Sequence, residues 1–264
     1  MANHVKKIAI LIDAENTQMS SLEAILTEIS KNGHVVVKRA YGDWSSPMLK
    51  NWKQTMNELA IQPIQQFSFT HGKNSSDAAM IIDAMDLLYT DQFNAFALIS
   101  SDSDFTKLAT RLRESQVFVY GVGERKTPVA FRNACDDFIY IDVLKTLDSE
   151  DAENGEIISE QDTNQVRSSR RLTRQELSRD AKLISILRNA AEECSDDSGW
   201  ALLSASGSLI KRQYPDFDSR NYGYAKMSKL IEATGLFDVK EEEIEGSIGK
   251  RLVYRDYRKY NSET

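Results

Sequence analysis

Residues 96–105, FALISSDSDF, join an apolar, strand-like run to two aspartates, Asp102 and Asp104, that flank Ser103. Two carboxylates this close repel each other, so a compensating group is expected near them. One interpretation is the start of a helix, where Asp and Ser cap free backbone N–H groups at the positive end of the helix dipole. The other is a bound cation, and the rest of the sequence bears on the choice.

The segments on both sides of this stretch alternate between strand-like and helix-like patterns. Short apolar or β-branched runs predict strands, and apolar residues at helical spacing predict helices between them. The expected strands cover residues 5–12, 34–41, 61–67, 93–99, 117–122 and 138–141, and the expected helices cover 18–31, 47–59, 76–89, 105–114 and 128–133. Because right-handed crossovers join parallel strands through helices, this order predicts an α/β fold, a parallel sheet with helices on both faces.

Acidic residues gather where two of these strands end. Asp13 ends the first strand and Asn16 follows one short turn later, while Asp102 and Asp104 follow the fourth strand. Ligands on doubly wound sheets bind at the carboxyl ends of the strands, and strands one and four are commonly neighbours there. Asp77, in the first turn of the third helix, is expected to reach the same edge.

Taken singly, these acids have ordinary explanations. Asp13 alone fits a solvated strand end, and Asp77 and Asp104 alone fit helix caps. Together, at strand ends that the topology brings close, they repel one another and favour a bound cation. The other aspartates of these segments are expected to be structural or solvated: Asp83, which lies about 240° around the helix from Asp77, and Asp86, Asp136 and Asp137.

Carboxylate oxygens are hard ligands, which suit Mg²⁺ or Mn²⁺. In nucleases with acidic clusters, such an ion lowers the pKa of a water and stabilises the charge that develops on a phosphate. Other chemistries lack support, since neither GxxxxGK[ST] nor GxGxxG follows a strand. His4, His34 and His71 are too scattered for a zinc site or a Ser–His–Asp triad.

The net charge of −7 hides an uneven distribution. Residues 1–147 carry 15 basic and 17 acidic side chains, and residues 148–165 carry 7 acidic and no basic ones. Residues 166–264 carry 18 basic and 16 acidic side chains. The aperiodic, acidic stretch is typical of a flexible linker, and it separates a mildly basic C-terminal part for which nucleic acid remains a plausible partner.

The C-terminal part has the pattern of a winged helix-turn-helix. Helices are expected over 179–193, 201–214 and 224–234, followed by a hairpin of 236–239 and 251–257. Cationic side chains contact phosphates and aromatic rings stack on bases, although such residues also occur in solvated faces and small cores. The candidate RNA-binding residues are Arg171, Arg174, Lys211, Arg212, Arg220, Tyr222, Tyr224 and Lys226, with Lys73 in the first part.

No apolar run approaches the roughly 18–20 residues of a membrane span, so no membrane association is expected. Cys135 and Cys194 are far apart and lack metal spacing, which predicts reduced thiols and a cytoplasmic location.

Three stretches identify a family. IAILIDAENTQ (8–18), GKNSSDAAMIIDAMDLLY (72–89) and FALISSDSDFTKLATRLRE (96–114) closely resemble the NYN domain family, a PIN-like group of ribonucleases, over about residues 5–145. The resemblance implies a PIN-like parallel-sheet sandwich. It also implies that the family's acidic positions bind a metal ion and carry out catalysis, together with an accessory polar residue. The sequence departs from the family at one position, since Ser101 stands where many members have Gly. The matching residues are Asp13, Asp77, Asp102 and Asp104, with Asn16 as the accessory residue.

The C-terminal part resembles the LOTUS or OST-HTH domain over roughly residues 172–260. The elements GW (199–200), PDFD (215–218), YGYAKMSKL (222–230) and GLF (235–237) match in order. The resemblance implies a small winged helix that binds RNA, including guanine-rich structured RNA in some members, or a protein partner in others.

The predicted organisation is a nuclease domain over 1–147, a linker over 148–171 and a LOTUS domain over 172–260. The predicted function is that of an endoribonuclease dependent on Mg²⁺ or Mn²⁺, whose LOTUS domain captures RNA. The alternative is a non-catalytic RNA-binding or regulatory adaptor, in which the LOTUS domain docks RNA or a protein.

Overall fold

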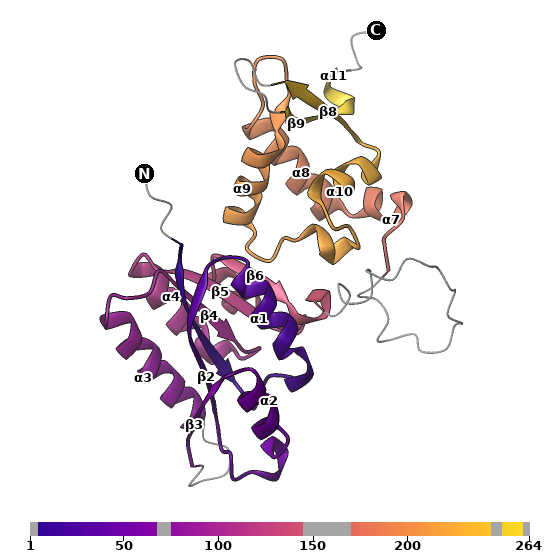
Figure 1. Ribbon diagram of the computed structural model, residues 1–264. Coiled ribbons are helices and arrows are strands. Elements are labelled where there is room, and N and C mark those ends of the chain that lie inside the picture. The colour runs from indigo at the N-terminus through magenta and orange to yellow at the C-terminus, as the bar shows by residue number, and fades with distance from the viewer. Residues whose placement is uncertain (1–4, 68–74, 145–169, 244–249, 261–264) are drawn as a thin grey trace, which may run out of the picture. The chain divides into compact units, whose positions relative to one another are not determined.

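The computed structural model describes residues 5–67, 75–144, 170–243 and 250–260. The chain divides into two units, Met1–Asn154 and Gly155–Thr264 (Figure 1). Lys73 and most of the predicted linker lie outside the described residues. Each unit is described below by itself.

The N-terminal unit is built on a six-stranded sheet in which every neighbouring pair of strands is parallel. Its strands are β1 (Lys7–Asp13), β2 (His34–Gly42), β3 (Gln62–Gln65), β4 (Ala95–Ile99), β5 (Phe118–Gly123) and β6 (Asp137–Tyr140). The order is β3-β2-β1-β4-β5-β6, so the chain first builds outward from β1 on one side and then on the other. The crevice at which an α/β sheet binds ligands lies at this reversal, between the carboxyl ends of β1 and β4.

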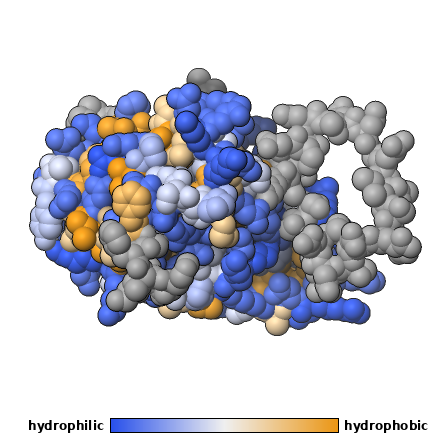
Figure 2. All heavy atoms as spheres, turned by 90° about the horizontal axis from the view of Figure 1, so that it is seen from below, coloured by the Kyte–Doolittle hydropathy of each residue, from blue (hydrophilic) through white to orange (hydrophobic). Residues whose placement is uncertain are grey.

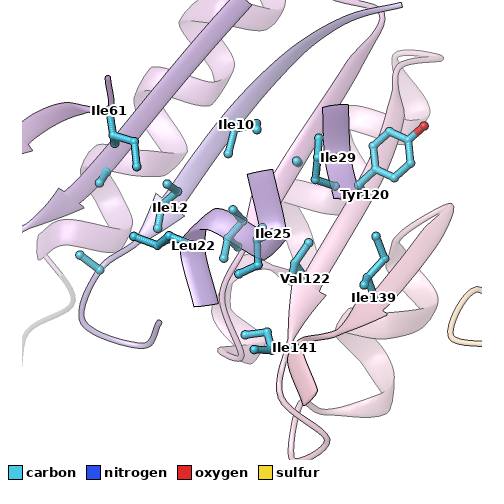
Figure 3. Close-up of a cluster of buried hydrophobic side chains, with 14 of the residues drawn as sticks. Ile10, Ile12, Leu22, Ile25, Ile29, Ile61, Tyr120, Val122, Ile139 and Ile141 are labelled. Atoms are coloured by element: carbon cyan, nitrogen blue, oxygen red, sulfur yellow. The ribbon is translucent and has the colours of Figure 1, made fainter. Parts of the chain in front are cut away.

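Helices cover both faces of this sheet. The alternating side chains of β1 divide between two apolar clusters: Ile10 and Ile12 pack on one face, and Ala9 and Leu11 on the other. The first face packs against α1 (Leu22–Ser30) and α2 (Trp52–Glu58), as Figure 3 shows for part of the cluster. The second face packs against α3 (Ser75–Tyr89), α4 (Thr106–Glu114) and α5 (Val129–Ala134). The predicted α/β fold with helices on both faces is therefore confirmed.

Several boundaries differ from the expectation. The segment predicted as a helix over 18–31 begins with the 3-10 turn η1 (Met19–Ser21), and α1 follows it. The segment predicted as a single helix over 47–59 begins instead with the 3-10 turn η2 (Pro47–Leu49), and α2 follows separately. Ser46 caps the turn, because its side chain accepts a hydrogen bond from the Met48 N–H, and Pro47 occupies the first position.

The C-terminal unit packs helices against a three-stranded antiparallel sheet. The helices are α7 (Arg174–Arg179), α8 (Ala181–Glu193), α9 (Leu203–Gln213), α10 (Met227–Thr234) and α11 (Tyr257–Tyr260). The strands are β7 (Ala201–Leu202), β8 (Phe237–Glu243) and β9 (Lys250–Asp256), in the order β7-β9-β8. One apolar cluster from α8, α9, α10 and the sheet forms its core. This arrangement is compatible with the predicted winged helix.

Four short elements of this unit were not predicted: α7, β7, α11 and the 3-10 turn η4 (Ser219–Tyr222). Helix α7 has only six residues and one buried side chain, Leu177, so it lacks apolar periodicity. A capping box between Thr173 and Glu176 stabilises its start. Strand β7 occupies the first two residues of the predicted helix over 201–214 and pairs with β9.

The surface is mainly hydrophilic on the face drawn in Figure 2, with smaller groups of apolar residues. Within the described residues, no helix combines the length and the apolar character that a membrane crossing requires. Both cysteines are free thiols: Cys135 is fully buried, which raises the pKa of its thiol, and Cys194 is half-buried.

Candidate metal centre

The carboxyl ends of β1 and β4 lie side by side at the centre of the sheet. Ile12 pairs with Ile99, so Asp13 and Ser100 leave the two strands together. The Ser100 hydroxyl donates a hydrogen bond to Asp13 Oδ2 at 2.7 Å and accepts one from the Asp102 N–H at 3.0 Å. One hydroxyl thus links the acids that follow two strands far apart in the sequence.

Asp13 lies beneath the edge and is only 1% exposed. Its carboxylate accepts further hydrogen bonds from Asn16 Nδ2 at 2.9 Å and from the backbone N–H groups of Glu15 and Asn16 at 3.2 Å. Burial raises the pKa of Asp13, and these hydrogen bonds oppose the rise. Asn16 therefore fixes the orientation of Asp13 from the loop that follows β1.

Three more carboxylates meet near Asp13. Asp77, Asp102 and Asp104 each offer one oxygen, and the three oxygens lie within 4.8 Å of one another. Asp77 comes from the first turn of α3 and is buried, Asp102 is half-buried, and Asp104 is exposed. The topology thus brings the four predicted aspartates to one edge of the sheet.

The DSD stretch both caps a turn and brings its acids close to Asp77. Asp102 caps the 3-10 turn η3 (Ser103–Phe105), because its Oδ1 accepts a hydrogen bond from the Asp104 N–H at 2.9 Å. The same turn carries the Asp104 carboxylate back toward Asp77. The cap therefore positions the acids, and it does not balance their charge.

The carboxylates at this edge of the sheet repel one another. The pKa of Asp77 is raised to about 7 by burial and by the charges of Asp13, Asp102, Asp104 and Glu15. Among the described residues, Asp13, Asp77 and Asp102 form no ion pair with a basic side chain. Within the part of the chain that the structure describes, no basic side chain therefore balances the charges of Asp13, Asp77 and Asp102.

The chemistry of the donors fits a hard divalent cation. All candidate ligands are carboxylate oxygens, the donors that Mg²⁺ and Mn²⁺ prefer, and one oxygen from each of the three aspartates lies within 4.8 Å of the others. Asp77, Asp102 and Asp104 could hold the ion directly. Asp13 adds negative charge near them.

Glu15 and Ser100 were not predicted to belong to this site. The Ser76 hydroxyl donates a hydrogen bond to Glu15 Oε2 at 3.2 Å, which links the loop after β1 to the start of α3. The sequence carried a signal for Glu15, since it follows Asp13 by two residues in the same strand-end loop.

Ser101 also has a structural role. Its hydroxyl oxygen accepts a hydrogen bond from the Glu124 N–H at 2.9 Å, and so fastens the loop after β5 beside Asp102. The serine that stands where many members of the resembled family have Gly therefore connects the loops after two strands.

The aspartates expected to be structural lie elsewhere. Asp83 receives hydrogen bonds from Arg39 Nη1 at 2.5 Å and from the Tyr41 hydroxyl. Asp136 accepts a hydrogen bond from the Val119 N–H at 2.8 Å and pairs with Arg113 at 3.0 Å. Asp86 is exposed on the outer side of α3, and Asp137 opens β6.

Tyr224, one of the candidate RNA-binding residues, is buried in the C-terminal unit. Tyr224 is only 5% exposed, and its hydroxyl donates a hydrogen bond to the Leu172 carbonyl at 2.7 Å. The Arg171 guanidinium lies 4.4 Å from the centre of its ring. Tyr224 therefore packs in the core of the unit, and little of its ring is exposed for stacking on a base.

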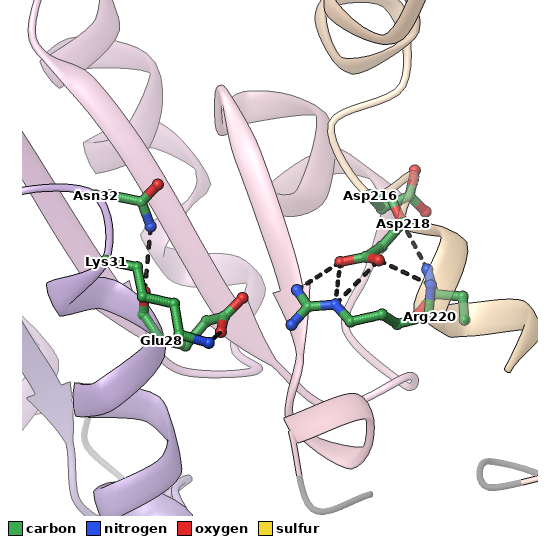
Figure 4. Close-up of polar contacts among 7 residues, drawn as sticks. Glu28, Lys31, Asn32, Asp216, Asp218 and Arg220 are labelled. Carbon is green, nitrogen blue, oxygen red and sulfur yellow. Dashed lines mark hydrogen bonds and ion pairs between the residues drawn. The ribbon is translucent and has the colours of Figure 1, made fainter. Parts of the chain in front are cut away.

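Two predicted RNA-binding arginines have partners inside the unit. Arg220 and Asp218 form a two-pronged ion pair with a shortest distance of 2.6 Å (Figure 4). Arg174 Nη2 donates a hydrogen bond to the Gly235 carbonyl, which follows the end of α10, at 3.0 Å. These contacts balance the charge of Arg220 and give Arg174 a capping role.

The other candidates remain at or near the surface. Lys226 precedes α10 and is exposed, as is Arg212 in the last turn of α9. Lys211 is half-buried, and Tyr222 is half-buried with its ring centre 6.2 Å from that of Phe217.

Comparison with known proteins agrees with the two-unit structure. The model of the NYN domain matches residues 7–142, and that of the OST-HTH/LOTUS domain matches residues 178–248. No curated protein matches the chain.

Two solved structures are similar to parts of the chain. A protein of unknown function from Vibrio parahaemolyticus shares 20% identity over 53% of this chain and 96% of its own, with a TM-score of 0.46. An uncharacterized protein from Nitrosomonas europaea shares 34% identity over 39% of this chain and 90% of its own, with a TM-score of 0.27.

NYN domains form a PIN-like nuclease family, and LOTUS domains bind RNA. The six-stranded parallel sheet with helices on both faces is typical of the PIN-like fold. The family match extends over half of the chain and includes each strand end that carries an acidic residue of the candidate site. The chain therefore belongs to the NYN domain family, with an OST-HTH/LOTUS domain in its C-terminal unit.

Proposed function

We propose that this protein is a metal-dependent endoribonuclease whose LOTUS domain captures the RNA. The proposal rests on one observation. Asp77, Asp102 and Asp104 each bring one carboxylate oxygen to the carboxyl edge of the sheet, and these oxygens lie within 4.8 Å of one another. The acids come from α3 and from the loop after β4, near the buried Asp13.

In this proposal, Asp77, Asp102 and Asp104 hold Mg²⁺ or Mn²⁺, which when bound activates a water and stabilises charge on the phosphate. Asp13 keeps the edge negative, and Ser100 and Asn16 hold its carboxylate in place. Asp102 also fixes the direction of Asp104 through the hydrogen bond that caps η3.

The LOTUS domain contributes RNA affinity in this proposal. The candidate contacts are the exposed side chains of Arg171, Arg212 and Lys226. The half-buried side chains of Lys211 and Tyr222 complete the set. Cations in such positions contact phosphates, and a partly exposed tyrosine can stack on a base. The cytoplasmic location expected from the two free thiols stays a prediction.

The test is cleavage of labelled single-stranded and structured RNAs by the full chain, with Mg²⁺, Mn²⁺ or a chelator. Asp102→Asn and Asp13→Asn remove one carboxylate each, and Asp86→Asn removes an exposed carboxylate of α3 outside the cluster. The proposal expects metal-dependent cleavage by the wild type and Asp86→Asn, and its loss in the other two variants. Circular dichroism checks that all four proteins fold.

Two results would contradict the proposal. If the wild type binds RNA and never cuts it, a non-catalytic RNA-binding or regulatory adaptor takes the place of the enzyme. Cleavage that persists in Asp102→Asn at the wild-type rate would assign the activity to another site or to a contaminant.

A further inference from the structure

We infer that Arg125 and Lys126, in the loop after β5, bind RNA phosphates beside the acidic edge of the sheet. This inference deepens the proposed nuclease function and rests on it. It assigns to the N-terminal unit its own contacts with the RNA backbone.

The distribution of charge at the edge is the first argument. A polyanion that approaches several carboxylates needs cations close by. Among the described residues, the loops after β1, β2 and β4 (14–18, 43–46 and 100–102) contain no lysine or arginine. The loop after β5 contains two in succession, Arg125 and Lys126.

The second argument is that this loop is fastened beside the acids. The Glu124 N–H donates a hydrogen bond to Ser101 Oγ at 2.9 Å, one residue before Asp102. Strands β4 and β5 also approach closely here, since a Cβ on Gly123 would lie 2.7 Å from the Ser100 carbonyl oxygen. The backbone that carries Arg125 and Lys126 is therefore held next to the proposed metal ligands.

Hydrogen bonds within the loop after β5 also hold it in place. Thr127 is 2% exposed, and its N–H and hydroxyl both donate to the Glu124 carbonyl, at 3.0 and 2.6 Å. From the loop after β1, Gln18 Nε2 donates to Glu124 Oε1 at 3.4 Å. These contacts hold the backbone that carries Arg125 and Lys126, so little order has to be gained when a ligand binds.

The third argument is that both cations face solvent and can exchange partners. The Lys126 side chain is 73% exposed and pairs with Glu124 at 2.9 Å, and the Arg125 side chain is 48% exposed and pairs with Asp142 at 2.7 Å. Exposed ion pairs contribute little to stability, so a phosphate can replace the carboxylate. The Arg125 guanidinium also lies 4.9 Å from the Tyr140 ring centre, and a guanidinium can contact two phosphate oxygens at once.

The test compares two double variants of the full chain. Arg125→Ala with Lys126→Ala removes the proposed contacts. Lys31→Ala with Arg111→Ala is the matched control, because it removes one lysine and one arginine that are exposed and paired with Glu28 and Glu114. Figure 4 shows the Lys31–Glu28 pair. Both control residues lie at the ends of helices that return to the amino edge of the sheet.

Two measurements are made on each protein. The first is the affinity for a labelled single-stranded RNA in a chelator, as a function of salt concentration. The slope of log affinity against log salt is expected to become shallower by about 1.4 in the Arg125/Lys126 variant, at about 0.7 per phosphate contact. The second is cleavage with Mn²⁺, in which KM is expected to rise about tenfold while kcat stays within about twofold. The control variant is expected to match the wild type in both.

The salt slope decides this inference, and cleavage by the wild type decides the proposed function. Equal slopes in the wild type and the Arg125/Lys126 variant would overturn the inference, even if the wild type cuts RNA. A wild type that never cuts RNA would overturn the proposed function, and a reduced slope would then still support RNA binding by this loop. The single variant Lys126→Ala, whose side chain pairs with Glu124 of its own loop, repeats the slope measurement if the double variant does not fold.

Discussion

Two aspartates on the same helix have opposite surroundings. Asp77 lies in the first turn of α3 among other carboxylates, and Asp83 lies further along and contacts Arg39 and Tyr41. The chain itself compensates the charge of Asp83. For Asp77, the described residues offer more negative charge and no ion pair. An acid with a partner in the chain stabilises the fold, whereas an acid without one points to a ligand from outside.

The position along the helix explains the difference. The start of α3 lies over the carboxyl ends of β1 and β4, where strands turn into loops and acidic side chains gather. Asp83 faces β2 instead, whose side chains include a cation and a phenol at Arg39 and Tyr41. The following predictions test whether this contrast governs activity, metal binding and stability.

The largest effect is expected on catalysis. Asp77→Asn should lower RNA cleavage by more than about a hundredfold, since even the outer partners of metal ligands are worth 10–100-fold. Asp86→Asn, on the exposed side of the same helix, should cleave at the wild-type rate. Initial rates at saturating Mn²⁺ measure the activity of both variants. Similar losses in the two variants would show that the position of the carboxylate on α3 does not determine its effect on cleavage.

Metal binding should stabilise the wild type. At a hundred times its Kd, Mn²⁺ or Mg²⁺ is expected to raise the free energy of unfolding by about 2.7 kcal/mol. The gain should disappear in Asp77→Asn, which loses a ligand, and remain in Asp83→Asn. Thermal unfolding with increasing metal measures the shift, and an equal shift in all three proteins would place the ion elsewhere.

The partnered aspartate should matter for the fold alone. Asp83→Asn is expected to lower the free energy of unfolding by about 1.5–3 kcal/mol, the range for hydrogen bonds to a charged group. Tyr41 is fully buried, and its hydroxyl donates a hydrogen bond to this carboxylate. Urea unfolding measures the loss. Stability equal to the wild type would show that the pair with Arg39 contributes nothing.

The smallest effect concerns pH. The pKa of Asp77 is about 7 in the folded chain and 3.8 in its ordinary state. Between these values the folded chain keeps a proton that the unfolded chain releases, so the stability of the metal-free protein falls as pH rises. Asp13, with its raised pKa, acts in the same direction.

Asp77→Asn should remove most of this slope and make the metal-free protein more stable by about 1–2 kcal/mol near neutral pH. Urea unfolding in a chelator, below and above the pKa of Asp77, measures both changes. Asp86→Asn is the control for removing one charge from α3. A slope in Asp77→Asn as steep as in the wild type would assign the titration to other groups.

The sheet and the acidic edge could be predicted because they follow from chain order. Apolar runs mark the strands, and a doubly wound order makes β1 and β4 neighbours, so Asp13 and Asp102 had to approach. Asp83 could be assigned to another face from the helical repeat alone.

Other features depended on contacts that residue type does not reveal. Tyr224 has the composition of a base-stacking residue, yet its ring lies in the core and its hydroxyl reaches Leu172. Arg220 is neutralised by Asp218, a partner only two positions away. Helix α7 owes its start to a capping box and has too few residues for a periodic pattern to appear.

The two thiols differ in a way that is useful for spectroscopy. Cys135 is fully buried in the N-terminal unit, and burial raises the pKa of its thiol, so a maleimide dye should react slowly with it. Cys194 is half-buried in the C-terminal unit and is the accessible site. The native sequence therefore offers a single attachment point for a fluorophore. Its anisotropy would report how freely the LOTUS domain tumbles before and after RNA is added.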